Sequence, residues 1–244
     1  MRKKYISESG TEKALKAEFD LLADQYHHEH KANVAITGED PEYFSEYKIA
    51  DLAGFVKENK LCSAQVMDFG CGIGNSVPFL RKHFVNSELC FADVSSRSIE
   101  IAKKRFPGAE RYILIDEKIP IETNSQDIVF SACVFHHITP EEHGHWLQEL
   151  LRVTRPGGLL VIYEHNPLNP LTLRAVNTCP LDVNAQLIRA GSMRIRVQGA
   201  GWEHARIDYK LFFPSFLRFL RPAEKHLSRV ALGAQYRVLA RKPL

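Results

Sequence analysis

The chain has 244 residues, of which 45% are hydrophobic and 25% are charged, and its formal net charge is +3. It shows no internal repeat and no low-complexity linker, and its longest apolar runs are too short to cross a bilayer. The basic N-terminus lacks the apolar stretch of a signal peptide, and the five cysteines form no C-x-x-C pair. We therefore expect a cytoplasmic, single-domain protein with reduced thiols.

The first 60 residues predict two helices that lie outside the central sheet. Apolar residues from Leu15 to Tyr26 recur at three- and four-residue steps, which is typical of a helix over 11–30. After a polar turn, Asp40-Pro41 begins a second helix that runs to about Glu58.

A strand, a glycine loop and a helix follow one another around residue 70. The apolar strand 64–68 ends in Asp68, and three glycines come next at alternate positions from Gly70 to Gly74. Glycines permit positive φ and remove Cβ atoms, so a ligand can rest on backbone N–H groups where the helix 76–84 begins. The dinucleotide fingerprint G-x-G-x-x-G is not met, because the third glycine comes one residue early. An acid before the glycines suits a ligand with a cationic amine better than a pyrophosphate.

A second acid ends the next strand. Strand 88–92 stops at Asp93, which lies 19 residues after Gly74. Rossmann-like nucleotide folds place the carboxylate that binds the ribose hydroxyls about 20 residues after the glycine loop. Asp93 is therefore predicted to bind a ribose, and Ser95 is predicted to cap a helix that runs to about Phe106.

The remaining elements continue the alternation of strands and helices. The sequence TPEE at 139–142 has the form of a capping box that begins a helix to about Val153, and PGG at 156–158 is predicted to turn the chain. Such alternation requires a parallel sheet with helices on both faces. The other predicted strands cover 111–115, 127–132, 159–163, 205–213 and 235–241, and the other predicted helices cover 182–191, 193–198 and a basic amphipathic segment from Pro214 to about Arg229.

Four segments together resemble the class I S-adenosylmethionine-dependent methyltransferases. They are DFGCGIGN at 68–75, FADVSSRSIEIA at 91–102, QDIVFSACVFHHI at 126–138 and LLRVTRPGGLLVIYEHNP at 150–167. The resemblance covers roughly residues 64–165. It implies an α/β, Rossmann-like, doubly wound fold with a mostly parallel seven-stranded sheet and an antiparallel last strand. It further implies one methyltransferase domain over 1–244, with a helical lid in 1–60, a cofactor-binding core in 61–165 and an acceptor-side part in 166–244.

The resemblance also implies how S-adenosylmethionine is bound. The glycine loop would hold its methionine moiety, Asp93 its ribose hydroxyls, and Asp116 would face the adenine amino group. Tyr26 of the lid either faces the cationic sulfonium or is an ordinary half-buried helix residue. S-adenosylhomocysteine is the expected product. The predicted cofactor-binding residues are Asp68, Gly70, Cys71, Gly72, Gly74, Asp93, Val94, Ser98, Asp116, Ser131, Cys133, His136 and Tyr26.

Two polar clusters follow the fourth and fifth predicted strands, beyond which open α/β sheets bind their ligands. His136 and His137 form the first cluster, and Glu164 and His165 belong to the second. Methyl transfer needs an acceptor in line with the S–C bond and, for a hydroxyl acceptor, a base within hydrogen-bond reach. We predict His137 and His165 as catalytic groups, with Glu164 as orienter or alternative base. The competing interpretation is that these histidines only pack near the cofactor.

Other histidines gather at 27–30 and 143–145. No spacing among them matches a standard zinc site, and positions i and i+2 on a helix do not face one another. We therefore predict no metal, and we expect these histidines on solvated helix faces.

The acceptor side is less constrained by the sequence. EHNPLNPLT at 164–172 is rich in turn formers and either shapes an acceptor pocket or forms a rigid connector. Residues 189–244 hold 12 Lys/Arg against 3 Asp/Glu, which indicates an anionic partner or the wet face of amphipathic helices. For the apolar and basic run 210–221 we favour packing on the sheet, with peripheral contact to an anionic membrane as the alternative.

These observations predict an S-adenosylmethionine-dependent methyltransferase that acts on a small-molecule acceptor, such as a sugar, a nucleotide sugar or a lipid-linked intermediate. Nucleic acid is not favoured, because no recognition motif accompanies the basic end of the chain. A non-catalytic S-adenosylmethionine-binding module is the alternative, and a nicotinamide-dependent oxidoreductase is a more distant one. The oligomeric state and the choice between O-, N- and C-methylation stay open.

Overall fold

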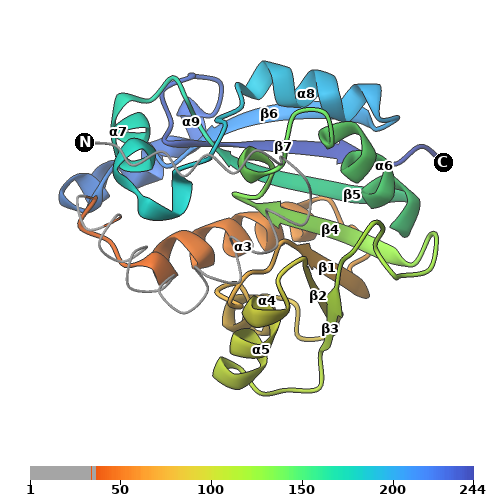
Figure 1. The fold of residues 1–244 in the computed structure, drawn as a ribbon. Coiled ribbons are helices and arrows are strands. Elements are labelled where there is room, and N and C mark those ends of the chain that lie inside the picture. Colours follow the sequence, from red (N-terminus) through yellow and green to blue (C-terminus); the bar gives the residue numbers. More distant parts are fainter. Residues whose placement is uncertain (1–33, 35–36) are drawn as a thin grey trace.

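The computed structural model describes Val34 and residues 37–244. The predicted helix over 11–30 and Tyr26 lie outside these residues. The described chain folds around one seven-stranded sheet with the strand order β3-β2-β1-β4-β5-β7-β6 (Figure 1). The strands are β1 (Gln65–Phe69), β2 (Glu88–Asp93), β3 (Arg111–Leu114), β4 (Gln126–Ala132), β5 (Thr154–His165), β6 (Glu203–Lys210) and β7 (Gln235–Arg241).

The direction of the strands confirms the predicted architecture. β1 to β5 pair in parallel, as βα alternation requires. β7 enters between β5 and β6 and is antiparallel to both. The doubly wound, mostly parallel sheet with an antiparallel last strand is therefore present. Its carboxyl-end edge, where β1, β2, β4 and β5 stop, is the edge at which this kind of sheet binds ligands.

Helices cover both faces of the sheet (Figure 1). Ile49 and Leu52 of α3 pack with Leu80 of α4 on one face, whereas Trp146 of α6 and Met193 of α8 are buried on the other. The helices are α3 (Pro41–Glu58), α4 (Val77–His83), α5 (Ser96–Arg105), α6 (His143–Val153), α7 (Pro170–Thr178), α8 (Ala190–Gly199) and α9 (Glu224–Leu227), with 3-10 turns η2 (Phe135–His137), η3 (Pro180–Asp182) and η4 (Ser215–Ala223).

Two predicted boundaries in the middle of the chain are wrong. The helix expected from the TPEE sequence begins only at His143, because Thr139 donates its hydroxyl to Glu142 at 2.7 Å within a turn that precedes the helix. The PGG sequence does not lie in a turn before the strand but forms a bulge within β5. The β4–β5 ladder passes from the pair Gln126–Thr154 to Ile128–Leu159, and Gly157 takes a φ of +72° inside that bulge.

The C-terminal third differs most from prediction. The expected helix 182–191 is absent, and α7 and η3 precede an irregular connection to α8. The expected helix from Pro214 to Arg229 is the 3-10 segment η4 followed by the single turn of α9. Pro222 lies inside η4 and removes a backbone donor, and Leu217 leaves helical φ/ψ. The run 210–221 packs on the sheet only at its start, where Lys210 ends β6 and Leu211 is buried, because neither η4 nor α9 has a buried residue.

Within Val34 and residues 37–244, no helix combines the length and the apolar character that crossing a membrane requires.

Candidate active site

The glycine loop connects β1 to α4 in a conformation that side chains resist. Gly70, Gly72 and Gly74 have φ values of +77°, +52° and +82°. A Cβ on Gly70 would stand 2.3 Å from a methyl carbon of Val134, so this glycine allows the loop to approach η2. A Cβ on Gly72 would meet nothing within 4 Å, because this glycine opens onto a cavity.

Asp93 ends β2 beneath the glycine loop. Its carboxylate accepts hydrogen bonds from the backbone N–H of Gly72 at 2.8 Å and of Ser95 at 2.9 Å. Ser95 in turn caps α5, as predicted, by accepting a bond from Ser98 N at 2.9 Å. These two hydrogen bonds fix the position of the Gly72 backbone relative to β2.

Asp68 is buried at the end of β1 and borders the same cavity. Ser76 precedes α4 and donates its hydroxyl to Asp68 instead of capping the helix. Burial raises the pKa of Asp68 to about 7, because the Ser76 hydrogen bond and the nearby Lys48 only partly offset the loss of solvation and the repulsion from Asp93. This carboxyl group therefore lacks a full positive counter-charge of its own.

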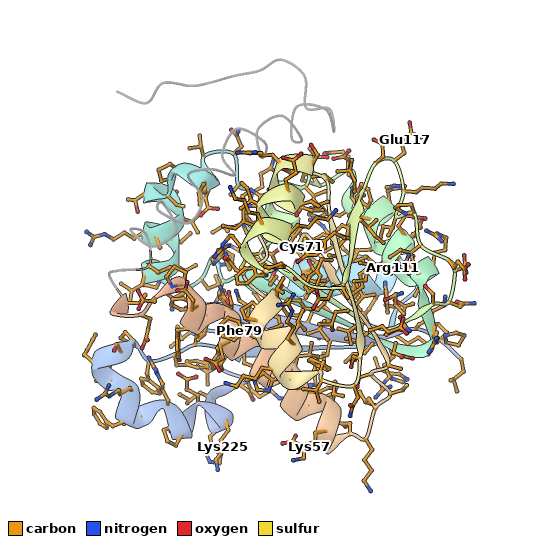
Figure 2. The ribbon with its side chains drawn as sticks, turned by 90° about the horizontal axis from the view of Figure 1, so that it is seen from below. Lys57, Cys71, Phe79, Arg111, Glu117 and Lys225 are labelled. Carbon is orange, nitrogen blue, oxygen red and sulfur yellow. The ribbon has the colours of Figure 1, made fainter. Side chains whose placement is uncertain are left out.

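One cavity of about 610 Å³ lies along the carboxyl-end edge of the sheet and borders both predicted polar clusters. Viewed from below in Figure 2, Cys71 of the glycine loop lies near the middle of the molecule. The predicted site residues that line the cavity are Asp68, Gly70, Cys71, Gly72, Asp93, Val94, Ser98, Cys133, His136, His137 and His165.

Four other predicted residues lie outside that lining. Gly74 faces α5, where a Cβ would stand 3.0 Å from Ala102. Asp116 is exposed, one residue beyond the cavity-lining Ile115. Ser131 and Glu164 are fully buried behind the cavity wall. Direct contact of these four residues with a ligand stays a prediction.

Glu164 positions the turn that follows β4. One carboxylate oxygen accepts the backbone N–H groups of Val134 at 3.0 Å and Phe135 at 2.7 Å, and the other lies 2.6 Å from Nδ1 of His136. Burial disfavours a charged His136, but the adjacent carboxylate outweighs it and raises the pKa of His136 to about 10. Both oxygens of Glu164 therefore face protein donors, and its predicted catalytic role as orienter or base stays a prediction.

Asp182 completes this group and was missed by the sequence prediction. Its Oδ1 atom lies 3.6 Å from Nε2 of His136 and 3.6 Å from Nε2 of His137. Burial, followed by the positive His136, lowers the pKa of His137 to about 3. Asp182 comes from η3, 45 residues after His137, so no local spacing announces it. We call His136, His137 and Asp182, with Glu164 behind them, the histidine cluster.

A thiol borders the histidine cluster. Cys133 directly follows β4 with a φ of +59°, and its Sγ lies 3.8 Å from Nζ of Lys48 and 3.5 Å from Nε2 of Gln235. Burial favours the neutral thiol, yet the Lys48 ammonium and the adjacent His165 lower the pKa of Cys133 to about 7. The His165 ring stands 5.1 Å from the His136 ring, which connects the two predicted polar clusters.

The segment 164–172 is both a clamped connector and a cavity wall. Asn166 donates to the carbonyl oxygen of Gly233 at 2.8 Å, and Asn169 accepts from Leu171 N and Thr172 N to cap α7. These amides therefore bind the backbone. Asn169, Leu171 and Thr172 nevertheless line the cavity, so the two interpretations of this sequence hold together.

Comparison with known proteins agrees with this geometry. Residues 67–162 match the family described as a methyltransferase domain. This segment of the chain is therefore similar to methyltransferase domains. The chain is 34% identical over 102 residues to malonyl-[acyl-carrier protein] O-methyltransferase of Hahella chejuensis, a match that covers 41% of this chain and 36% of the relative. The chain spans between about a third and two thirds of the length of the curated relatives it matches.

Solved methyltransferase structures share the fold. A S-adenosylmethionine-dependent methyltransferase from Archaeoglobus fulgidus aligns with a TM-score of 0.59 at 15% identity, covering 83% of this chain and all of that one. Phosphoethanolamine N-methyltransferase 2 of Haemonchus contortus, in complex with S-adenosyl-L-methionine, aligns with a TM-score of 0.66 at 15% identity. That alignment covers 100% of this chain and 62% of the Haemonchus chain.

The residues that line the cavity fit S-adenosylmethionine, the cofactor that the sequence predicts. The open backbone at Gly72 and the carboxylate of Asp93 suit a ribose-bearing ligand, and the acid at Asp68 suits its amine. The far side of the cavity is different, since it is mainly apolar. Its apolar lining residues are Leu171, Val176, Leu181, Leu211, Phe212, Phe213 and Phe216.

Proposed function

We propose that this methyltransferase transfers the methyl group of S-adenosylmethionine to a small acceptor with a substantial apolar portion. The supporting observation is the single cavity that joins the glycine loop to the histidine cluster and then to the apolar side chains of α7 and residues 211–216. A non-catalytic binding module would need only the first of these parts. Among the predicted acceptors, the apolar wall favours a lipid-linked compound over a sugar or a nucleotide sugar.

Each part of the cavity has a defined task in this proposal. Asp93 and the glycine loop bind the cofactor, whose sulfonium supplies an electrophilic methyl group when bound. Asp68 pairs its carboxylate with the positively charged amine of the cofactor. His165 and His137 face the space between cofactor and acceptor, where one of them takes a proton from a hydroxyl or amine. The apolar wall orients the acceptor and excludes water.

Cofactor binding is tested by calorimetry with S-adenosylmethionine. Asp93→Ala should weaken binding by about 1–3 kcal/mol, because ligand hydroxyls and the Gly72 N–H lose their acceptor. Asp116→Ala is the matched comparison, since it removes an equal charge from an exposed position. Unchanged affinity in Asp93→Ala would contradict the assignment of the ribose site. A loss in Asp116→Ala would support the predicted adenine contact.

The acceptor class is tested with methyl-labelled S-adenosylmethionine and a mixture of cell metabolites. After incubation, the products are partitioned between an organic and an aqueous phase. Label that enters the organic phase, and that is lost with Asp93→Ala, supports an apolar acceptor. Label confined to the aqueous phase contradicts it and returns sugars and nucleotide sugars to consideration.

Peripheral contact with an anionic membrane is a further part of the proposal. Phe216 and Phe219 of η4 are 76% and 71% exposed, and the basic Arg218 lies between them in the sequence. Phe216 also lines the cavity, so this surface is continuous with the acceptor side. Vesicles with anionic lipid should sediment the wild-type protein at low salt, and Phe216→Ser/Phe219→Ser should reduce that binding. No sedimentation of the wild type would remove the membrane from the proposal.

A further inference from the structure

The histidine cluster gathers three ligand atoms of a kind that binds transition metals. One imidazole nitrogen each of His136 and His137 and a carboxylate oxygen of Asp182 lie within 4.8 Å of one another. Both nitrogens stand 3.6 Å from the same Oδ1 atom. An ion about 2.1 Å from each ligand would fit between Asp182 and either imidazole, and a small rotation of the rings would bring all three onto it.

The group behind these ligands has the form that metal sites use. A metal-bound histidine commonly donates its other ring N–H to a carboxylate, which fixes its orientation. Nδ1 of His136 lies 2.6 Å from Glu164, and Glu164 is itself held by two backbone N–H groups. Nε2 of His136 is therefore aimed at Asp182 by buried groups.

The chain also fixes Asp182 from its own side. Gln186 N donates to the carbonyl oxygen of His136 at 2.7 Å, which ties the segment after η3 to the turn η2. Asp182 N donates to Cys179 O at 3.2 Å and closes the 3-10 turn. Backbone hydrogen bonds thus fix the chain at Asp182 and again at Gln186, and Asp182 lines the cavity between them.

We propose that His136, His137 and Asp182 bind a divalent transition-metal ion such as Zn²⁺, Fe²⁺ or Mn²⁺. Two imidazoles and one carboxylate leave further coordination positions open, and all three residues border the cavity. When bound, the ion would act as a Lewis acid and would hold an oxygen of the acceptor. This role rests on the proposed methyl transfer, whereas the binding of the ion does not.

The ion is tested with metal alone, in the absence of cofactor and acceptor. Purified full-length protein, stripped with a chelator, is titrated with Zn²⁺ by calorimetry and with Co²⁺ by visible absorption, whose intensity reports coordination geometry. We expect one ion per chain with a spectrum of low coordination number. Asp182→Asn and, separately, His137→Asn should weaken affinity at least 100-fold, and Glu164→Gln should weaken it about 10- to 100-fold.

Adventitious binding by other histidines is controlled with two variants. His27→Ala/His28→Ala/His30→Ala removes the histidine-rich stretch near the N-terminus, and His204→Ala removes an exposed histidine. Both should retain wild-type affinity. Circular dichroism confirms the fold of every variant, and the pair of ligand variants guards against misfolding of one of them.

The outcomes separate this inference from the proposed function. The metal site is overturned if the wild type binds no stoichiometric ion. It is also overturned if Asp182→Asn and His137→Asn both bind the ion with wild-type affinity. If S-adenosylmethionine still binds in that case, the methyltransferase proposal stands. Conversely, tight metal binding together with no cofactor binding would keep the metal site and contradict the proposed function.

Discussion

Two neighbouring residues of β5 serve two very different groups of buried charge. Tyr163 packs among the core residues on the α3 face, whereas Glu164, next in the strand, points to the opposite face. Behind Tyr163 lies what we call the closed cluster, in which ion pairs connect α3 to the sheet. It consists of Asp51, Tyr163, Asp208, Lys210 and Arg237.

The closed cluster satisfies its charges with one another. Arg237 lies 2.6 Å from Asp51 and 2.7 Å from Asp208, and Lys210 lies 2.7 Å from Asp51. None of its members lines the cavity. In the histidine cluster, by contrast, His136, His137 and Asp182 all line the cavity. Buried charges that form ion pairs away from the cavity stabilise the fold, whereas buried charges that border the cavity can contact a ligand.

The largest effect should follow from opening the closed cluster. Arg237→Met leaves the buried Asp208 without its closest cation, so we expect the free energy of unfolding to fall by about 3–5 kcal/mol. Arg206→Met is the matched control, because Arg206 contacts the same Asp208 at 3.1 Å from a side chain that is 49% exposed. It should cost less than about 1 kcal/mol. Urea titrations followed by circular dichroism give both values, and equal midpoints would erase the distinction between the clusters.

Removing a cavity-facing group should affect the rate rather than the fold. His165→Ala should lower turnover by about 10²-fold or more, if His165 is the base that takes the acceptor proton, with little change in affinity for S-adenosylmethionine. Turnover is measured with methyl-labelled cofactor and affinity by calorimetry. His204→Ala, at an exposed position, serves as control. An unaltered rate in His165→Ala would remove this residue from the mechanism.

The local parts of this architecture could be predicted from the sequence. The glycine loop, the strand that ends at Asp93 and the Ser95 cap each depend on residues close in sequence, so spacing and capping rules identify them. The antiparallel β7 came from the family resemblance rather than from its own pattern. Its bounds at 235–241 nevertheless agree with the apolar periodicity.

The long-range parts could not be predicted in this way. Asp182 reaches His136 and His137 only because η3 folds back over η2, and Asp51 meets Arg237 across 186 residues. The prediction of a helix from Pro214 was wrong for a local reason. It relied on the amphipathic pattern and gave too little weight to Pro222, which interrupts a helix. A hydrophobic period of 3.6 residues identifies the buried face of a helix, but it does not show which residues distant in sequence come into contact.

A buried acid on the cofactor side offers a smaller, pH-dependent effect. Asp68 must be ionised to attract the amine of S-adenosylmethionine, and burial raises its pKa to about 7. Affinity should therefore fall as pH drops below 7, approaching tenfold, or about 1.4 kcal/mol, for each pH unit. Asp68→Asn should bind more weakly and show no such dependence between pH 5.5 and 7.5. A parallel pH profile in wild type and Asp68→Asn would assign the titration to another group.

The raised pKa of Asp68 has the opposite effect on the stability of the ligand-free protein. A carboxyl group whose pKa is higher in the folded than in the unfolded state favours folding while it is protonated. The contribution of Asp68 is therefore fully present below its ordinary value of 3.8 and is lost as pH rises through about 7. Asp68→Asn should thus flatten the decline in unfolding free energy over this range. Cofactor binding and stability respond to pH in opposite directions at one carboxyl group.

The smallest effect should come from the hydroxyl at the boundary of the closed cluster. Tyr163 Oη lies 2.6 Å from Asp51, but Asp51 keeps Arg237 and Lys210 as partners when that hydroxyl is removed. Tyr163→Phe should therefore cost only about 1 kcal/mol of unfolding free energy, the typical value of one hydrogen bond. A loss near that of Arg237→Met would show that the hydroxyl is essential to the pairing of Asp51. Unchanged methyl transfer in Tyr163→Phe would confirm that this cluster acts on stability alone, although it adjoins Glu164 in the strand.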